Sequence, residues 1–527
     1  MKVWMKKTGK VFSVALLLFL SMFSGCINPF QTGSCKFISY EIIDDDGYAA
    51  LRVEVNATSG LTLKLFDPFN NLVGEKQLEN GVQTVTIDLA ESYETPADGS
   101  YTLKVYNGGT NVVTKKSFVV TPTSLSISDF RGIWWKEGVD SYSLIEVVLS
   151  IENNGNAPVY LKEMNVTVDG VSSFTAPIFN GTVEGKTSKG VASSFYVPGL
   201  DESEHVFVVK VFDYSGNVLF SKTFSEEPYY DSAMKRFSLS WKYKWRSFSI
   251  SLPLPAELLS FYSSIKRPVI EDYSFYVISP YDDSYVDLVT RRLISLFNGE
   301  GEELIDFVAS FVQSIPYAEE EGEYPQFPIE LLNNGSGDCE DKAIFASSIL
   351  YNLGYDVALL RFPEHMAVGV HLPDATYDGR IYYEDESGKR YLFLETSNTA
   401  WTLGNADLEY RHAGNFTLYH VTSKPVLVEE CKPPTRYTSV VKDYISVDTT
   451  VKNIGTEDAE NVYVSAAFLT QYGVVVNGEK SSLFTVAAGR EKRVSFTVDY
   501  PDVTVVKVYV RVVYEDKIST EATFVFA

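Results

Sequence analysis

The sequence predicts a multidomain, mostly β protein with three all-β sandwiches and one α+β domain. The 527 residues are enough for several domains, and 45% of them are hydrophobic, which is ample material for packed cores. The 34 Tyr and 33 Phe, against 6 Met, are typical of β-sheets. Apolar and polar residues alternate over most of the chain, whereas one central stretch has the spacing of amphipathic helices. We therefore expect helices to be a minority and to lie in one domain.

Residues 1–25 have the layout of a secretory signal peptide. Lysines precede the apolar run Val11 to Phe23, which is shorter than the roughly 20 residues of a bilayer-spanning helix. Small residues then stand directly before Cys26, an arrangement that resembles lipoprotein signals. This resemblance implies a lipid on Cys26 and a tether over 26–36. The alternatives are an uncleaved anchor and an ordinary signal peptide. We expect the protein at the extracellular face of the membrane, lipid-anchored, or secreted.

Residues 37–122 are predicted to form the first β-sandwich. Leu61, Leu63 and Leu65 alternate with polar residues, as in a strand with one buried face. Turn pairs such as Asn80-Gly81 separate several runs of this kind. Short strands joined by polar turns within one such segment are typical of an immunoglobulin-like fold.

An internal repeat predicts two further sandwiches of the same type. The segments Asn153 to Gly155 and Asn453 to Gly455 each follow an apolar strand and precede another one. The surrounding stretches, 123–227 and 436–527, resemble the immunoglobulin-like adhesion modules of archaeal surface proteins. Pro433 and Pro434 are expected to mark the junction before the last module, because proline favours extended linkers.

Residues 228–435 are predicted to form the α+β domain. Amphipathic helices come first, over 256–266, 284–297, 303–313 and 338–353, and strands follow over 357–361, 366–372, 380–384 and 391–395. Helices followed by a run of strands favour an antiparallel sheet. Trp241 and Trp245 are expected to pack in cores or at module junctions rather than to bind carbohydrate.

Cys339 is the candidate nucleophile. It follows a glycine-containing approach at the start of a predicted helix, where free backbone N–H groups and the positive end of the helix dipole lower the pKa of a thiol. The neighbouring acids Asp338, Glu340 and Asp341 act in the opposite direction, so a nearby imidazolium is needed. The alternative is a buried structural thiol.

His365 and Glu395 are the candidate partners of this thiol. His365 opens one predicted strand and Glu395 closes another, so antiparallel pairing of the two strands would bring the carboxylate to the imidazole. Taken singly, His365 is an ordinary strand histidine and Glu395 a carboxylate that faces water. The ordered set of Cys, His and acid favours the catalytic interpretation.

At these residues the chain resembles the transglutaminase-like superfamily, in its archaeal extracellular branch. The resemblance is carried by Gln313 to Tyr317, Gly337 to Lys342, Leu353 to Val357, His365 to Val370 and Leu394 to Ser397. It implies a papain-like fold in which Cys339 attacks an amide carbonyl, His365 moves protons and Glu395 holds His365. The family's acid is usually Asp, and Glu395 is one methylene longer. The family also uses an upstream side chain as oxyanion donor, for which Gln313 is the candidate.

The other cysteines leave two arrangements open. If Cys26 carries lipid and Cys339 is free, Cys35 and Cys431 can form a disulfide, which an oxidising exterior permits, or remain two unpaired thiols. Asn-x-Ser/Thr sequons provide five glycosylation candidates, namely Asn56, Asn165, Asn180, Asn334 and Asn415.

Charge and mechanism exclude several functions. The formal net charge of −24 would repel nucleic acid. No metal site is expected, because His365 and His371 lie too far apart on one strand to share an ion. Thioester chemistry needs no cofactor.

We expect a membrane-tethered cysteine enzyme that acts at the cell surface on a protein or peptide substrate. Peptide or isopeptide hydrolysis is the first expectation, amide cross-linking the second, and cell-envelope proteins are candidate partners. The alternative is a non-catalytic surface adhesin whose transglutaminase-like domain is degenerate.

Overall fold

A computed structural model describes residues 33–108, 111–122, 124–268, 270–319, 322, 324–412, 414–438 and 442–525. The predicted signal peptide, Cys26 and most of the predicted tether lie outside these residues. The chain divides into two compact units, which are essentially the first sandwich and the remainder of the chain. Within the ranges given above, no helix is both long enough and apolar enough to cross a membrane.

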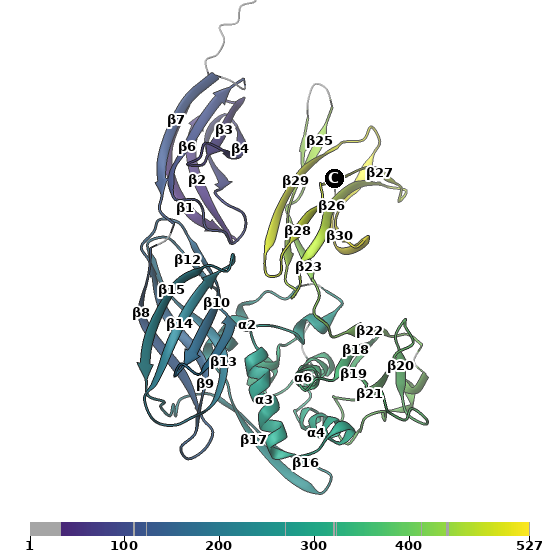
Figure 1. The fold of residues 1–527 in the computed structure, drawn as a ribbon. Coiled ribbons are helices and arrows are strands. Elements are labelled where there is room, and N and C mark those ends of the chain that lie inside the picture. Colours follow the sequence, from purple (N-terminus) through teal and green to yellow (C-terminus); the bar gives the residue numbers. More distant parts are fainter. Residues whose placement is uncertain are drawn as a thin grey trace, which may run out of the picture. The chain divides into compact units, whose positions relative to one another are not determined.

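The first unit is a two-sheet sandwich (Figure 1). Its strands are β1 (Cys35–Asp45), β2 (Tyr48–Ala57), β3 (Leu61–Phe66), β4 (Leu72–Leu78), β5 (Gly81–Asp88), β6 (Gly99–Asn107) and β7 (Asn111–Val120). One antiparallel sheet has the order β1-β2-β5 and the other β4-β3-β6-β7. Leu61, Leu63 and Leu65 are buried, so the alternation in the sequence marks the face of β3 that packs in the core.

The second unit contains two sandwiches with the same strand order. The earlier one is built from β8 (Leu125–Lys136), β9 (Tyr142–Asn153), β10 (Val159–Val168), β11 (Ser172–Pro177), β12 (Thr182–Val183), β13 (Thr187–Leu200), β14 (His205–Asp213) and β15 (Val218–Glu226). The later one is built from β23 (Leu427–Cys431), β24 (Thr435–Tyr437), β25 (Tyr444–Asn453), β26 (Ala459–Thr470), β27 (Val475–Lys480), β28 (Phe484–Val486), β29 (Glu491–Asp499), β30 (Val505–Tyr514) and β31 (Lys517–Val525). One sheet runs β11-β10-β14-β15 in the earlier module and β27-β26-β30-β31 in the later one.

The repeated asparagines explain the internal repeat. Both are almost completely buried at the end of a strand, Asn153 on β9 and Asn453 on β25. The side-chain amide of Asn153 donates to the carbonyl of Val183 in β12 (3.1 Å), and that of Asn453 donates to the carbonyl of Val486 in β28 (2.9 Å). Each asparagine therefore holds the equivalent short strand in its own module, and one sheet has the same strand order in both modules.

The last sandwich begins earlier than the predicted boundary at residue 436. Strand β23 pairs with β25, with Leu427 opposite Asn453, so its sheet already starts at residue 427. Pro433 and Pro434 lie between β23 and β24, which both pair with β25. The prolines separate two strands of one sheet and do not mark the junction before the module.

The central domain has helices packed against an antiparallel sheet. After the hairpin β16 (Arg236–Tyr243) and β17 (Arg246–Pro253) come α2 (Ala256–Ser264), a 3₁₀ turn (Tyr273–Tyr276), α3 (Asp283–Leu296), α4 (Gly301–Gln313), α5 (Pro328–Asn334) and α6 (Cys339–Asn352). The sheet follows as β18 (Asp356–Phe362), β19 (His365–His371), β20 (Tyr382–Glu384), β21 (Arg390–Leu394) and, after a second 3₁₀ turn (Leu408–His412), β22 (Thr417–His420), in the order β20-β21-β19-β18-β22. The predicted α+β order of helices before sheet is confirmed, whereas the hairpin, α5 and β22 are additions that the sequence did not indicate.

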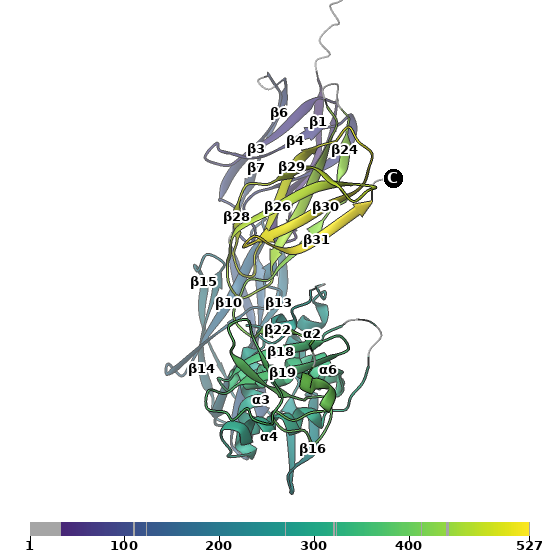
Figure 2. The same ribbon diagram turned by 90° about the vertical axis from the view of Figure 1, so that its right-hand side faces the viewer.

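Helix α6 lies at the centre of this domain. Figures 1 and 2 both draw it beside β18 and β19. Ile344, Ile349 and Leu350 of the helix share one buried cluster with Val357 and Val368 of the two strands. Because α6 is covered by protein on nearly every side, the position of its first residue is fixed by packing.

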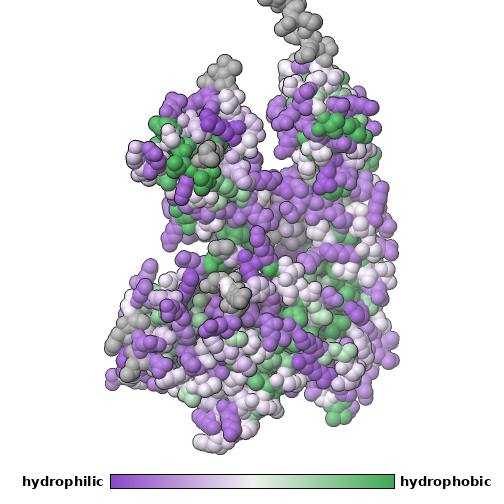
Figure 3. All heavy atoms as spheres, turned by 180° about the vertical axis from the view of Figure 1, so that it is seen from behind, coloured by the Kyte–Doolittle hydropathy of each residue, from purple (hydrophilic) through white to green (hydrophobic). Residues whose placement is uncertain are grey.

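The two tryptophans of the hairpin have different surroundings. Trp241 is buried, and its indole N–H donates to the hydroxyl of Ser310 (3.2 Å). Tyr243 pairs with Arg246, so Lys244 and Trp245 form the turn between the strands, and Trp245 is 88% exposed. The prediction that Trp245 packs in a core or at a module junction is therefore wrong. Elsewhere, the face in Figure 3 is mostly hydrophilic with scattered apolar patches, an ordinary water-exposed surface.

Candidate functional site

The start of α6 fixes the position of Cys339. The helix begins at Cys339, and Asp338 caps it, with the carboxylate of Asp338 accepting the N–H of Asp341 (3.5 Å) and the carboxylate of Asp341 accepting the N–H of Asp338 (3.3 Å). A Cβ on Gly337 would lie only 2.6 Å from both the carboxylate of Asp341 and the side chain of Leu331. The glycine of the predicted approach is thus required by this close contact, and the predicted helix start is confirmed.

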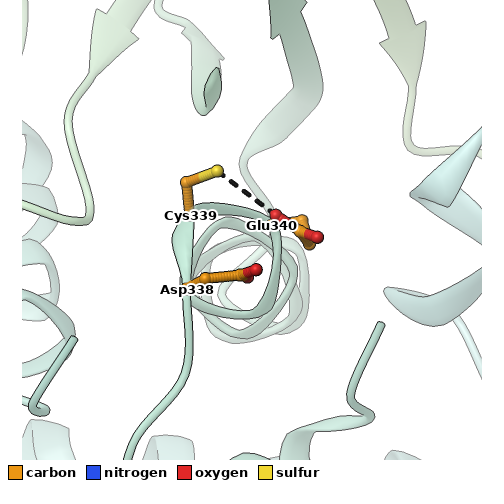
Figure 4. A group of neighbouring side chains, drawn as sticks. All are labelled: Asp338, Cys339 and Glu340. Carbon is orange, nitrogen blue, oxygen red and sulfur yellow. Dashed lines mark hydrogen bonds between the residues drawn. The ribbon is translucent and has the colours of Figure 1, made fainter. Parts of the chain in front are cut away.

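The Cys339 thiol is partly buried and has two neighbours of opposite effect. It donates a hydrogen bond to the carboxylate of Glu340 (3.2 Å), as Figure 4 shows. Burial, followed by the charge of Glu340, raises the pKa of the thiol well above its ordinary value, and the N–H of Met366 acts against this rise. In this arrangement Cys339 is a thiol, not a thiolate.

Glu340 has an unusual protonation equilibrium of its own. Burial and the charge of Asp338 raise its pKa to about 8, so its carboxyl group is largely protonated at neutral pH. Asp338, Cys339 and Glu340 are consecutive residues whose ligand atoms lie within 4.8 Å of one another, a spacing that a cation could bridge (Figure 4). The hydrogen bond between the thiol and Glu340 accounts for the same closeness, and we assign no metal to the group.

His365 and Glu395 are in direct contact. β19 and β21 are antiparallel neighbours, with Val368 opposite Leu394, and this pairing brings the start of one strand to the end of the other, as the sequence predicted. Nε2 of His365 lies 3.1 Å from Oε2 of Glu395. The side chain of His365 is 12% exposed and that of Glu395 only 2%. The additional methylene of Glu395, compared with an aspartate, does not prevent the contact.

The surroundings of Glu395 favour its ionised form. Burial alone would raise the pKa of this carboxyl group, but the hydrogen bond and charge of His365 and the backbone N–H groups of Ser397 and Asn398 together lower it below its ordinary value. These N–H groups donate to Oε1 at 2.7 and 3.3 Å. One carboxylate oxygen is therefore held by the backbone, and the other is free to hold the imidazole.

The imidazole has a defined orientation relative to the thiol. Because Glu395 occupies Nε2, Nδ1 is the ring nitrogen that remains for Cys339. The backbone N–H of Met366, the residue next to His365, lowers the pKa of the thiol, so the nucleophile candidate lies at the same strand end as the base candidate. Among the residues that the structure describes, however, the thiol hydrogen-bonds to Glu340 and not to His365.

Gln313 does not have the role that the sequence suggested. Its side-chain amide is buried and donates to the backbone carbonyls of Glu395 (2.8 Å) and Trp401 (3.0 Å). Both N–H groups are used in these two contacts, and none is left for an oxyanion at Cys339. The oxyanion prediction is therefore corrected: Gln313 fastens the backbone at Glu395.

Three residues of the site were not singled out from the sequence. Lys342 is fully buried one helical turn after Cys339, and a lysine within the apolar pattern of α6 was the signal that could have found it. Tyr410 packs against the imidazole of His365 with ring centroids 5.1 Å apart. Tyr317 is 51% exposed, and the partial burial of its hydroxyl raises its pKa to about 12.

Backbone hydrogen bonds hold Tyr317 near the thiol. The N–H of Gly337 donates to the carbonyl of Pro316 (3.2 Å), and the N–H of Ala318 donates to the carbonyl of Gly337 (3.1 Å). The segment on either side of Tyr317 thus runs beside the approach to α6. Its exposed ring therefore stands on a segment beside the start of the helix that begins with Cys339.

The other predicted site residues lie apart from this centre. Cys35 is a free thiol at the start of β1 and Cys431 a free thiol at the end of β23; they belong to different compact units, and their pairing stays a prediction. Cys431 contacts the backbone carbonyl of Lys432 (3.4 Å). The sequon asparagines are accessible to different degrees: Asn56, Asn180, Asn334 and Asn415 are exposed, and Asn165 is half-buried with its amide on Ser173 and Thr175.

Comparison with known proteins adds distant likenesses only. No family model matches the chain, and no curated protein matches it. Among solved structures, dimeric latent PorU from Porphyromonas gingivalis is 9% identical with a TM-score of 0.16 over 94% of this chain and 34% of that chain. Amycolatopsis orientalis exo-chitosanase CsxA is 10% identical with a TM-score of 0.15, over 92% and 78% of the two chains. Red sea bream transglutaminase is 12% identical with a TM-score of 0.15, over 72% and 79%.

The chain spans about a third of the length of PorU. Scores this low carry no information on activity. The fold and the site therefore define the protein by their own geometry: a multidomain, mostly β chain whose α+β domain holds a histidine–glutamate pair in a sheet that packs against a helix starting with a cysteine.

Proposed function

We propose that the central domain is a cysteine enzyme that acts on amide bonds through a thioester intermediate, with peptide or isopeptide hydrolysis as its reaction. The observation that carries the proposal is the 3.1 Å contact between His365 and Glu395, because His365 opens the strand β19 that packs against the helix starting at Cys339. A buried carboxylate on one nitrogen of an imidazole, with a thiol at the same strand end, is the arrangement that activates a sulfur nucleophile.

The steps follow from the positions of these groups. The thiol turns from Glu340 toward Nδ1 of His365 and transfers its proton, and Glu395 stabilises the imidazolium that forms. The thiolate attacks the amide carbonyl, the carbon–nitrogen bond breaks, and the imidazolium gives its proton to the leaving amine. Water activated by His365 then cleaves the thioester, which releases the acid and restores the thiol.

The start of α6 supplies an oxyanion site in place of Gln313. The backbone N–H of Cys339 is one of the first N–H groups of the helix, which have no partner within the helix. An N–H in this position, aided by the helix dipole, stabilises the negative oxygen of the tetrahedral intermediate. Tyr317, half exposed beside the thiol, is the side chain that an approaching peptide meets.

A specific observation favours a second candidate function. The resting thiol donates to Glu340, and its pKa is raised, which is the behaviour of an unreactive cysteine. Under this interpretation the chain is a surface adhesin, and the central domain is a binding or spacer module. Three of the four folded modules are sandwiches, which suits an adhesin as well as an enzyme.

Thiol reactivity distinguishes the two candidates. The rate of iodoacetamide alkylation at Cys339, followed by mass spectrometry of the peptide that carries it, is compared with the rate for free cysteine and for the His365→Ala variant. An enzyme gives a rate above that of free cysteine at neutral pH and loses it in His365→Ala. If the wild type and the variant react at equal rates, both at or below the rate for free cysteine, the enzyme proposal is contradicted and the adhesin is supported.

The product identifies the reaction of an active enzyme. A glutamine- or lysine-linked peptide is incubated with the protein and a labelled amine. Release of the acid or the free peptide supports hydrolysis, whereas incorporation of the amine supports cross-linking, the second reaction that the thioester permits.

We further propose that the protein is tethered by lipid on Cys26 at the extracellular face of the membrane, where it meets protein substrates of the cell envelope. The support is the layout of the first 26 residues of the sequence. Partition into a detergent phase, compared between the wild type and Cys26→Ser, tests the anchor. Equal partition of the two proteins would contradict it.

A further inference from the structure

Lys342 is a fully buried cation whose contacts are unusual. It has 0% exposure and lies on α6 one turn after Cys339. Its ammonium group donates to three backbone carbonyls, those of Ile315 (2.8 Å), Ser397 (3.2 Å) and Gln313 (3.4 Å). All three acceptors are neutral, although a buried charge is costly unless it is well paired. Packing alone therefore does not explain why a lysine, and not an apolar residue, occupies this position.

The three carbonyls belong to the segments that hold Glu395. Ser397 follows Glu395 after one residue, and its own N–H donates to Oε1 of Glu395 (2.7 Å). Gln313 ends α4, and its side-chain amide donates to the carbonyl of Glu395 (2.8 Å). Lys342 thus contacts both segments that hold Glu395, the end of α4 and the residues that follow Glu395.

The charge of Lys342 also acts on the acid. Burial lowers the pKa of the ammonium group to about 8, and the negative charge of Glu395 acts against this decrease. The interaction is mutual, so a protonated Lys342 favours the ionised form of Glu395, which is the form that orients and stabilises an imidazolium. A methionine would fill nearly the same space but would provide neither the donors nor the charge.

We propose that Lys342 is a positioning residue, which ties the helix that begins with Cys339 to the segment that holds Glu395 and so keeps this carboxylate on the imidazole of His365. The catalytic meaning of this role rests on the proposed function of the site. The contact itself, between three carbonyls and one ammonium group, does not depend on that function.

The test compares Lys342→Met with a matched control on the same helix. Ser348→Ala removes a buried hydroxyl that donates to the carbonyls of Val277 (3.2 Å) and Ile344 (3.0 Å) and is remote from the acid in the contacts that it makes. Circular dichroism and thermal unfolding verify that each full-length variant is folded. Should Lys342→Met fail to fold, Lys342→Gln, which retains amide donors but not the charge, is measured in its place.

Two readouts are measured on each protein. The first is the NMR signal of the Nε2 proton of His365 in protein labelled with ¹⁵N-histidine. The spectrum is simple because the chain has five histidines. This proton is shifted downfield and protected from exchange only while it is hydrogen-bonded to Glu395. The second is the pH profile of Cys339 alkylation.

We expect Lys342→Met to lose the downfield signal and to alkylate about tenfold more slowly at neutral pH, which corresponds to one unit in the apparent pKa of the ion pair. Ser348→Ala retains both. An unchanged signal and profile in a folded Lys342 variant would overturn the inference. If the wild type alkylates no faster than free cysteine but its downfield signal disappears in Lys342→Met, the proposed enzyme function fails while the positioning role stands.

Discussion

Nε2 of His365 lies 3.1 Å from Oε2 of Glu395, although 30 residues separate them in the chain. The contact depends on the register of β19 against β21, which sets Val368 opposite Leu394. The carboxylate is almost completely buried and accepts two backbone N–H groups on its other oxygen, so its position does not depend on the imidazole alone. Such a carboxylate can hold an imidazolium without taking its proton.

Replacing Glu395 by Gln should reduce the reactivity of Cys339. The amide fills the same space but carries no charge, so the imidazolium loses its stabilising partner. Because an adjacent opposite charge shifts a pKa by about 1–3 units, we expect alkylation at neutral pH to slow by about tenfold to a hundredfold. Glu384→Gln is the control, since it neutralises an exposed carboxylate of the same sheet that pairs with Arg390 (2.8 Å). Equal slowing in both variants would count against a specific role for Glu395.

Replacing Glu340 by Gln should have the opposite effect. The carboxylate of Glu340 accepts the hydrogen bond of the thiol and raises its pKa, so removal of the charge favours the thiolate. We expect alkylation to become several-fold faster, most clearly above pH 8, where wild-type Glu340 is ionised. Glu364→Gln, which removes an exposed charge from the turn before His365, should leave the rate nearly unchanged. A slower reaction in Glu340→Gln would indicate that Glu340 serves as the base.

The pair of His365 and Glu395 could be predicted because it depends on local rules. Antiparallel pairing places the start of one strand beside the end of its neighbour, and both strands can be recognised from their short apolar runs. The capped start of α6 follows from rules of the same kind, since Asp338 and Asp341 have the spacing of a capping pair.

The roles of Gln313 and Lys342 could not be predicted in this way. Both roles depend on which backbone carbonyls the folded chain brings to a buried donor, and these carbonyls lie 27 to 88 residues away in the sequence. A sequence shows that a lysine lies on an apolar helix, but not what its ammonium group contacts. The exposed Trp245 was missed for a simpler reason: hydrophobicity predicted a core, and the register of the hairpin put the residue in the turn.

Gly337→Ala should destabilise the start of α6. The added methyl group would lie 2.6 Å from Leu331 and from the carboxylate of Asp341, which caps the helix through the N–H of Asp338. We expect a loss of about 1–3 kcal/mol in the free energy of unfolding, the usual cost of overpacking. Gly190→Ala is a suitable control, because no atom lies within 4 Å of its added Cβ. If urea denaturation gives the same midpoint for both variants, the close approach at Gly337 is not limiting.

Removing the charge of Glu146 should flatten the dependence of stability on pH. Glu146 is buried on β9 and accepts the N–H of Leu258 (2.8 Å), and burial raises its pKa from an ordinary 4.5 to about 8. Because the folded-state pKa is the higher one, its contribution to stability is fully present below pH 4.5 and is lost as the pH rises to about 8. Over the 2.5 units from pH 4.5 to 7 the loss reaches at most about 3 kcal/mol. We expect Glu146→Gln to be as stable as the wild type near pH 4.5 and more stable at pH 8, as followed by urea denaturation at several pH values. The control is Glu152→Gln, which changes an exposed carboxylate on the same strand and should show the same dependence of stability on pH as the wild type. If the stability of Glu146→Gln also changes with pH in parallel with that of the wild type, Glu146 is ionised in the folded protein at neutral pH.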